Sequence, residues 1–254
     1  MSRVLVSLAA LVALAYLAAC AALFVFQRSL IYHPQPRRLA DGVPLLALPT
    51  PDGPVLVSTR PRQGADALIY LGGNAEDVSA SLPGLSAAFP DHALFLLHYR
   101  GYGASAGQPT EAALVADALA LFDKVHAAHP NIVLVGRSLG SGVAVQLASR
   151  RPVTRLVLVT PYDSLQDLAA RQFPWFPVRW LLQDKFESWK YAPQVAAPTL
   201  IIAARHDEVI PRASTEALHA RFRSGVAAFK VIAGTGHNTI SDSPNYLRLL
   251  KGLP

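Results

Sequence analysis

The chain has 254 residues, of which 52% are hydrophobic, and its 23 Lys and Arg against 17 Asp and Glu give a formal net charge of +6. This length allows one domain with a large core, and the single cysteine excludes an intrachain disulfide. The basic charge does not by itself indicate nucleic-acid binding, because no run of Lys and Arg accompanies it, and we expect no nucleic-acid partner.

Residues 4–26 form an uncharged apolar segment near the start of the chain. A membrane span needs about 20 apolar residues, whereas the apolar core of a signal peptide has about 7–15. We therefore expect residues 1–28 to be a single-pass anchor in a bacterial inner membrane, and residues 29–254 to fold as one domain. Attraction to membrane lipid also accounts for part of the basic charge.

The anchor leaves two alternatives open. The sequence Leu-Ala-Ala-Cys that ends at Cys20 resembles a bacterial lipobox, so lipidation of Cys20 is an alternative, although the apolar residues continue to Phe26. Arg28, Arg37 and Arg38 follow the segment, which favours a cytoplasmic domain by the positive-inside rule. Export of the domain is the other possibility, so the side of the membrane stays open.

Short apolar runs alternate with helical patterns through the rest of the chain. The runs occupy residues 55–58, 67–71, 93–97, 132–135, 156–159, 200–203 and 229–232. This alternation predicts an α/β fold with a mostly parallel central sheet and helices on both faces. Functional side chains in such sheets lie at the carboxyl ends of the strands. Thr110 is placed to cap a helix that runs to about residue 128.

The fourth of these runs ends in Gly136-Arg137-Ser138-Leu139-Gly140. Gly-x-Ser-x-Gly between a strand and a helix is the pattern of a nucleophile elbow, in which a strained turn exposes the serine hydroxyl above the sheet. The small apolar residues that follow are typical of a helix packed on a sheet. A Gly-rich turn with a surface serine is the alternative, and we predict that Ser138 is a nucleophile.

A serine nucleophile needs a base that accepts its proton and a group that orients the base, in the chain order Ser, Asp or Glu, His. Asp207 and His237 each follow a predicted strand, and they come after Ser138 in that order. We predict His237 as the general base and Asp207 as its orienting partner. Asp163 is the competing carboxylate, whereas the side chain of Glu208 is expected to point elsewhere.

An oxyanion that forms during attack on a carbonyl needs hydrogen-bond donors. The backbone N–H of Leu139, directly after the nucleophile, is the first predicted donor. The second is the N–H of Asn74, because Gly72 and Gly73 before it allow the backbone to approach a substrate closely. A helix N-cap is the alternative role of Asn74.

An aromatic-rich insertion, interrupted by prolines, occupies residues 173–182 between two predicted strands. We expect a small cap at about residues 164–192, whose aromatic rings line an acyl pocket. Ordinary packing of a helix on the sheet is the alternative. The chain has no metal-ligand spacing, and its glycine-rich loops lack the lysine of a phosphate-binding loop, so we expect no cofactor and no metal ion.

These motifs together resemble the membrane-anchored α/β-hydrolase-domain family, a group of serine-aminopeptidase-like hydrolases that includes protein depalmitoylases. The similar segments are residues 26–34, 71–75, 99–111, 136–140, 207–211 and 236–238. Gly72 stands where that family often has a histidine, which removes a side chain that braces the loop but leaves the backbone role intact. The resemblance implies the α/β-hydrolase fold and hydrolase chemistry.

We therefore expect residues 29–254 to be the catalytic domain of a membrane-tethered serine hydrolase. It would cleave carboxylic ester or thioester bonds through an acyl-enzyme, and its substrate would be a small-molecule or lipid acyl compound. A serine peptidase that uses the same residues is one alternative, and a non-catalytic binding protein with this fold is the other.

Overall fold

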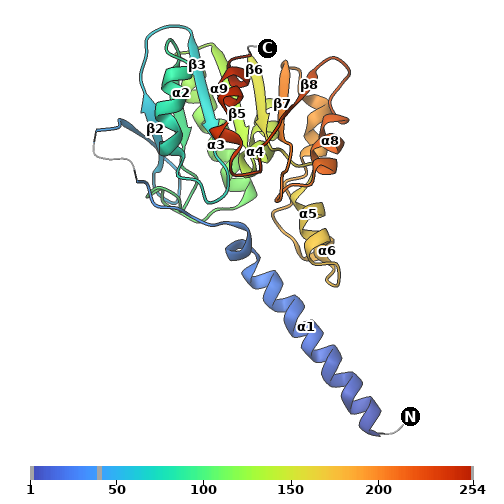
Figure 1. Cartoon of the computed structure of the whole chain (residues 1–254). Helices are drawn as coiled ribbons and strands as arrows, with labels where there is room; N and C mark the ends of the chain where they lie inside the picture. Colours follow the sequence, from blue (N-terminus) through green and yellow to red (C-terminus); the bar gives the residue numbers. More distant parts are fainter. Residues whose placement is uncertain (1–2, 39–41, 253–254) are drawn as a thin grey trace.

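An eight-stranded sheet organises the fold of the computed structural model, which describes residues 3–38 and 42–252 (Figure 1). The strands are β1 Leu45–Leu48, β2 Val55–Arg60, β3 Asp66–Leu71, β4 Ala93–Leu97, β5 Asn131–Arg137, β6 Arg155–Val159, β7 Thr199–Ala204 and β8 Ala227–Ile232. Their order is β1-β2-β4-β3-β5-β6-β7-β8. The pairs β1–β2 and β2–β4 are antiparallel and the other five are parallel, which confirms the predicted mostly parallel sheet.

Helices cover both faces of this sheet. The helices α2 Leu82–Ala88 and α9 Pro244–Lys251 lie on one face, and α3 Glu111–His126, α4 Leu139–Ala148 and α8 Arg212–His219 lie on the other. Strand β3 is buried on both sides: Leu68 and Tyr70 pack under α2, whereas Ile69 and Leu71 face the α3 and α4 side. The hydroxyl of Thr110 accepts from the N–H of Ala113 at 3.1 Å, so α3 begins at the predicted cap.

The long helix α1 Arg3–Ile31 projects away from the domain (Figure 1). It has 29 residues, and an 18-residue window within it has a mean hydropathy of 2.5, so the helix is long and apolar enough to cross a membrane. At 1.5 Å per residue the helix is about 44 Å long, which exceeds the hydrocarbon thickness of about 30 Å. The first two residues of the expected anchor, and the last two of the expected domain, lie outside the described residues.

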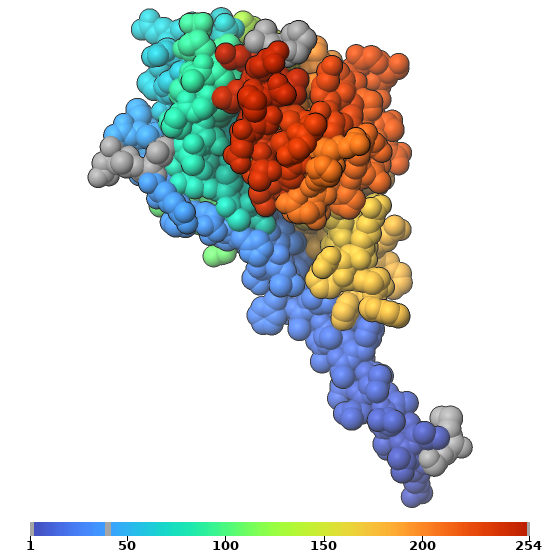
Figure 2. All heavy atoms as spheres, in the orientation of Figure 1, coloured from blue at the N-terminus to red at the C-terminus, as the bar shows by residue number. Residues whose placement is uncertain are grey.

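The segment between β6 and β7 forms a small helical layer beside the domain-proximal end of α1. It contains α5 Leu165–Gln172, α6 Val178–Leu181 and α7 Ser188–Tyr191. In Figure 2 this segment, coloured gold, lies against the blue helix. We call residues 164–187, with α5 and α6, the cap.

Candidate active site

Ser138 lies at a strained turn between β5 and α4. Its backbone angles are φ 48° and ψ −116°, a left-handed conformation that is costly for a residue with a side chain. The N–H of Ser138 donates to the carbonyl of Val159 on β6 at 2.9 Å, which ties the turn to the sheet. Both flanking glycines are needed, because a Cβ at Gly136 would lie 2.6 Å from Ala144 Cβ and one at Gly140 would lie 2.1 Å from the Leu71 carbonyl oxygen.

The structure brings Ser138, His237 and Asp207 into one hydrogen-bonded line. His237 Nε2 lies 2.9 Å from Ser138 Oγ, and His237 Nδ1 lies 2.9 Å from Asp207 Oδ2. Asp207 also accepts from the backbone N–H groups of Val209 and Ile210 at 3.0 and 2.7 Å, which fixes its carboxylate. The side chains of His237 and Asp207 are only 7% and 5% exposed, so water competes little with their hydrogen bond.

Glu208 also contacts the His237 loop, so the expectation that its side chain points elsewhere was wrong. Its Oε2 accepts from the backbone N–H of His237 at 3.0 Å. This hydrogen bond, with one from its own backbone, lowers the pKa of Glu208. A Cβ at Gly236 would lie 2.7 Å from the same oxygen, so a larger residue there would displace the Glu208 carboxylate. Glu208 therefore holds the main chain of the loop while Asp207 holds its imidazole ring.

The competing carboxylate, Asp163, lies elsewhere. Its backbone N–H donates to Ser214 Oγ at 3.0 Å, and within residues 3–38 and 42–252 its Oδ1 is buried without a hydrogen-bond partner. Burial raises the pKa of Asp163. Asp207, and not Asp163, is the carboxylate that contacts His237.

The loop after β3 approaches Ser138 closely. An ideal Cβ at Gly73 would lie 3.6 Å from Ser138 Cβ, and the next residue, Asn74, lines the same cavity as Ser138. The alternative role of Asn74 as a helix cap is wrong: Asp77 caps the following 3-10 helix Val78–Ser81, and its side chain accepts from the N–H of Ser79.

The carboxylate of Glu76 braces this loop, in which Gly72 has no side chain that could do so. Glu76 Oε2 accepts from the N–H of Gly73 at 2.6 Å, and its Oε1 accepts from the hydroxyl of Tyr70 at 2.7 Å. A Cβ at Gly72 would lie 2.3 Å from Val78 Cγ1, so no side chain fits there without displacing Val78. We did not foresee the role of Glu76. Its spacing of three residues from Gly73 is the signal that could have revealed it, since a carboxylate at that spacing can reach back to a backbone N–H.

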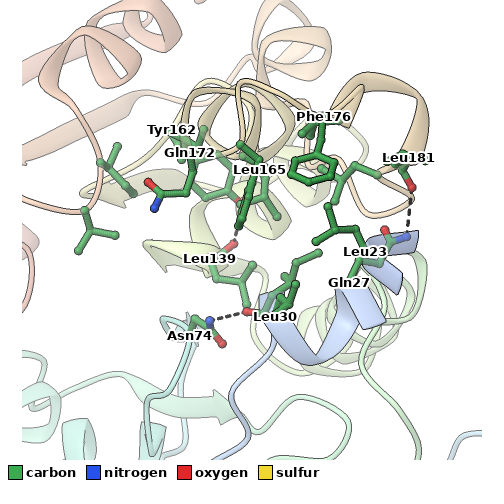
Figure 3. Close-up of a pocket in the computed structure, with 18 of the residues that line it drawn as sticks. Leu23, Gln27, Leu30, Asn74, Leu139, Tyr162, Leu165, Gln172, Phe176 and Leu181 are labelled. Carbon is green, nitrogen blue, oxygen red and sulfur yellow. Dashed lines mark hydrogen bonds between the residues drawn. The ribbon is translucent and has the colours of Figure 1, made fainter. Parts of the chain in front are cut away.

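An apolar cavity of about 430 Å³ opens beside Ser138 and Leu139 (Figure 3). Part of its wall comes from the predicted cap, with Leu165, Leu168, Phe173, Phe176 and Leu181. Trp175 and Trp180 are instead 84% and 87% exposed, so the aromatic residues of the cap divide between the cavity and the surface.

No metal site accompanies these groups in the described part of the chain. Among residues 3–38 and 42–252, no three His, Cys, Asp or Glu side chains are grouped so that they could hold a metal ion.

The fold and this site define an α/β-hydrolase-fold protein. Residues 66–186 match a family described as alpha/beta hydrolase fold. Among solved structures, the esterase Pf2001 of Pyrococcus furiosus has a TM-score of 0.68 at 16% identity, covering 87% of this chain and 97% of that one. A membrane phospholipase A, described as a bacterial virulence factor, has a TM-score of 0.67 at 14% identity, covering 99% of this chain and 97% of that one. Likeness at these identities shows the shared fold.

Curated relatives are more similar in sequence. The uncharacterized protein Rv2307c of Mycobacterium tuberculosis is 36% identical over 182 residues, which are 68% of this chain and 63% of that protein. Alpha/beta hydrolase domain-containing protein 17B of Homo sapiens is 32% identical over 191 residues, which are 72% of this chain and 64% of that protein. The chain thus spans less than two thirds of the length of these relatives.

Proposed function

We propose that the protein is a membrane-tethered serine hydrolase that cleaves carboxylic ester or thioester bonds of acyl substrates. The observation that carries this proposal is the line of hydrogen bonds from Asp207 through His237 to Ser138, with Ser138 strained at an elbow that faces an apolar cavity. A serine hydroxyl is a weak nucleophile unless an adjacent base accepts its proton, and this arrangement supplies that base.

In the proposed reaction, Ser138 Oγ attacks the acyl carbonyl carbon while His237 Nε2 takes the hydroxyl proton. Asp207 holds the His237 ring and stabilises its charged form. The N–H groups of Leu139 and Asn74 stabilise the oxyanion. The carbon–oxygen or carbon–sulfur bond to the leaving group then breaks, and His237 gives that group its proton. A water molecule, activated by His237, cleaves the acyl-enzyme and restores Ser138.

The lining of the cavity supports an acyl substrate. Leu, Ile, Val and Phe side chains dominate it, and among the described residues no Asp, Glu, Lys or Arg contributes to it. A hydrocarbon chain suits such a surface, because burying apolar area is favourable at about 25 cal/mol per Å². The free amine of an aminopeptidase substrate would instead need a carboxylate near Ser138. The lining therefore favours ester or thioester hydrolysis over peptide cleavage.

Membrane attachment is supported by the length, composition and exposure of α1. Cys20 lies within this helix, which continues for eleven further residues to Ile31, so a mature lipoprotein beginning at Cys20 would keep an apolar helical stub. A single-pass anchor accounts for an uninterrupted apolar helix, because about 20 of its 29 residues are enough to cross the hydrocarbon core. We therefore propose that the protein resides in a bacterial inner membrane.

Steady-state kinetics of the full chain in detergent micelles tests this proposal. We expect turnover of nitrophenyl acyl esters and acyl thioesters, and Ser138→Ala should lower kcat by at least about 10³-fold. Cleavage of aminoacyl anilides without cleavage of esters would identify a peptidase. Binding of an acyl ester without turnover by the wild-type protein would identify a binding protein.

A further inference from the structure

The last turns of α1 form one wall of the cavity that contains Ser138. Leu23, Gln27, Leu30 and Ile31 line it from α1 (Figure 3). We propose that this part of the anchor is a component of the substrate site, where Leu23 and Leu30 set the length of hydrocarbon chain that the enzyme accepts. This proposal rests on the proposed function and deepens it, because it assigns the specificity of the hydrolase to its membrane anchor.

Gln27 fixes α1 to the cap. It is a polar residue at the apolar end of the anchor and is only 6% exposed. Its Nε2 donates to the carbonyl of Leu181 at 3.1 Å, and its Oε1 accepts from the N–H of Gln183 at 2.7 Å. The Arg28 guanidinium adds an ion pair with Asp184 at 3.1 Å. A helix that served only as a tether would not need buried amide contacts with the domain, so these bonds indicate a fixed position.

The Asn74 side chain fixes the end of α1 to the loop after β3, which carries the proposed oxyanion donor. Its side-chain amide donates to the carbonyl of Ile31 at 2.5 Å and accepts from the N–H of His33 at 3.0 Å. The hydroxyl of Tyr102 also donates to the Asn74 side chain, at 2.7 Å. Burial raises the pKa of Tyr102 to about 12, so this hydroxyl remains a hydrogen-bond donor well above neutral pH. The residue proposed to supply an oxyanion donor through its backbone thus holds the anchor through its side chain.

The contact between cap and anchor extends towards the membrane. Tyr16 Oη donates to the carbonyl of Trp175 at 3.0 Å, and the Tyr16 ring stacks on Phe176 with centroids 5.7 Å apart. Tyr16 precedes Arg28 by twelve residues, about 18 Å along a helix. If Arg28 lies at the lipid headgroups, the tip of the cap lies beside the apolar part of the bilayer, where exposed Trp175 and Trp180 are favourable. The cavity between cap and anchor is therefore placed to receive the hydrocarbon chain of a bilayer-borne acyl ester.

Chain-length profiles of full-length variants test the role of Leu23. The substrates are nitrophenyl butyrate, octanoate and palmitate in detergent micelles. Leu23→Trp should fill part of the cavity and lower the ratio of kcat/KM for palmitate to that for butyrate by about tenfold. Leu23→Ala should enlarge the cavity and move the preference towards longer chains. Leu8→Trp, at an exposed position far from the cap, is the matched control and should keep the wild-type profile.

The outcomes separate the proposed role of α1 in specificity from the proposed hydrolase function. Opposite shifts for the two Leu23 variants support a specificity wall in α1. If Leu23→Ala is active and keeps the wild-type chain-length profile, α1 is not part of the site, although the proposed hydrolase function stands. If Leu23→Trp loses all activity through misfolding, Leu23→Ala still decides. If the wild-type protein hydrolyses none of the three esters, the proposed function fails and this proposal fails with it.

Discussion

Gly140→Ala tests how closely α4 approaches the loop after β3, which carries the proposed oxyanion donor Asn74. An ideal Cβ at this position would lie 2.1 Å from the carbonyl oxygen of Leu71 and 2.6 Å from that of Gly72. Both atoms belong to the backbone, so the clash cannot be relieved by rotating a side chain. The substitution must instead move the start of α4 away from the loop, and with it the N–H of Leu139 away from that of Asn74.

We expect two measurable consequences. Overpacking of a well-filled interior costs about 1–3 kcal/mol, and a backbone clash belongs at the upper end, so the free energy of unfolding should fall by about 3 kcal/mol. Loss of a single oxyanion donor lowers kcat by about 10²–10³-fold, and separation of the proposed pair should have an effect of that size. Urea denaturation followed by tryptophan fluorescence and hydrolysis of nitrophenyl butyrate measure the two effects.

Gly84→Ala is the matched control. A Cβ at Gly84, in α2, would meet no atom within 4 Å. Because alanine is favoured over glycine inside a helix, this variant should be about 0.5–1 kcal/mol more stable than the wild-type protein, with unchanged kinetics. A Gly140→Ala variant with wild-type stability and wild-type kcat would refute the proposed close approach of elbow and loop.

Three other predictions concern Asp207, the buried His98 and the two exposed tryptophans of the cap. Asp207→Asn should lower kcat for ester hydrolysis by about 10³–10⁴-fold, whereas Asp163→Asn should leave kcat near the wild-type value; the opposite order would reverse the assignment. Burial lowers the pKa of His98 to about 4, so the folded state resists a proton that the unfolded state binds near pH 6.5. The free energy of unfolding should therefore be intact above pH 6.5 and fall by up to about 3 kcal/mol towards pH 4. The fall should be smaller in His98→Gln, and urea melts that show an equal fall in the wild-type protein and this variant would contradict the prediction. The double variant Trp175→Ser and Trp180→Ser should lower hydrolysis of a long-chain ester in anionic vesicles about tenfold, equal to about 1.4 kcal/mol of cap insertion into the interface, without changing hydrolysis of a soluble short-chain ester. Equal losses on both substrates would argue against insertion of the cap.

The parallel part of the sheet and the three residues of the candidate triad could be located from sequence for one physical reason. Ser138, Asp207 and His237 each follow an apolar strand, and parallel strands bring their carboxyl ends to one edge of the sheet. This holds although Ser138 and His237 are 99 residues apart in the chain and the cap lies between them. The short strand β1 was missed, because Leu-Leu-Ala-Leu is only four residues long and contains no β-branched residue, although Pro44 and Pro49 flank it.

The contacts that support the site were less predictable. Glu76 and Glu208 act on backbone N–H groups, and their reach depends on loop conformations such as the positive φ of 56° at Ala75. The packing of α1 on the cap could not be predicted either, because a uniformly apolar sequence does not indicate which side of a helix contacts the rest of the protein. The polar groups of Tyr16, Gln27 and Arg28 lie on the side that contacts the cap.

Labelling with a fluorophosphonate probe most directly tests the central claim that Ser138 is the nucleophile of a serine hydrolase. Such probes react with a serine only when a neighbouring base activates it. In the full-length protein we predict one adduct, located on Ser138 by peptide mass spectrometry, absent in Ser138→Ala and strongly reduced in His237→Ala. Equal labelling of the wild-type protein and Ser138→Ala, or no labelling of the folded wild-type protein, would contradict the claim.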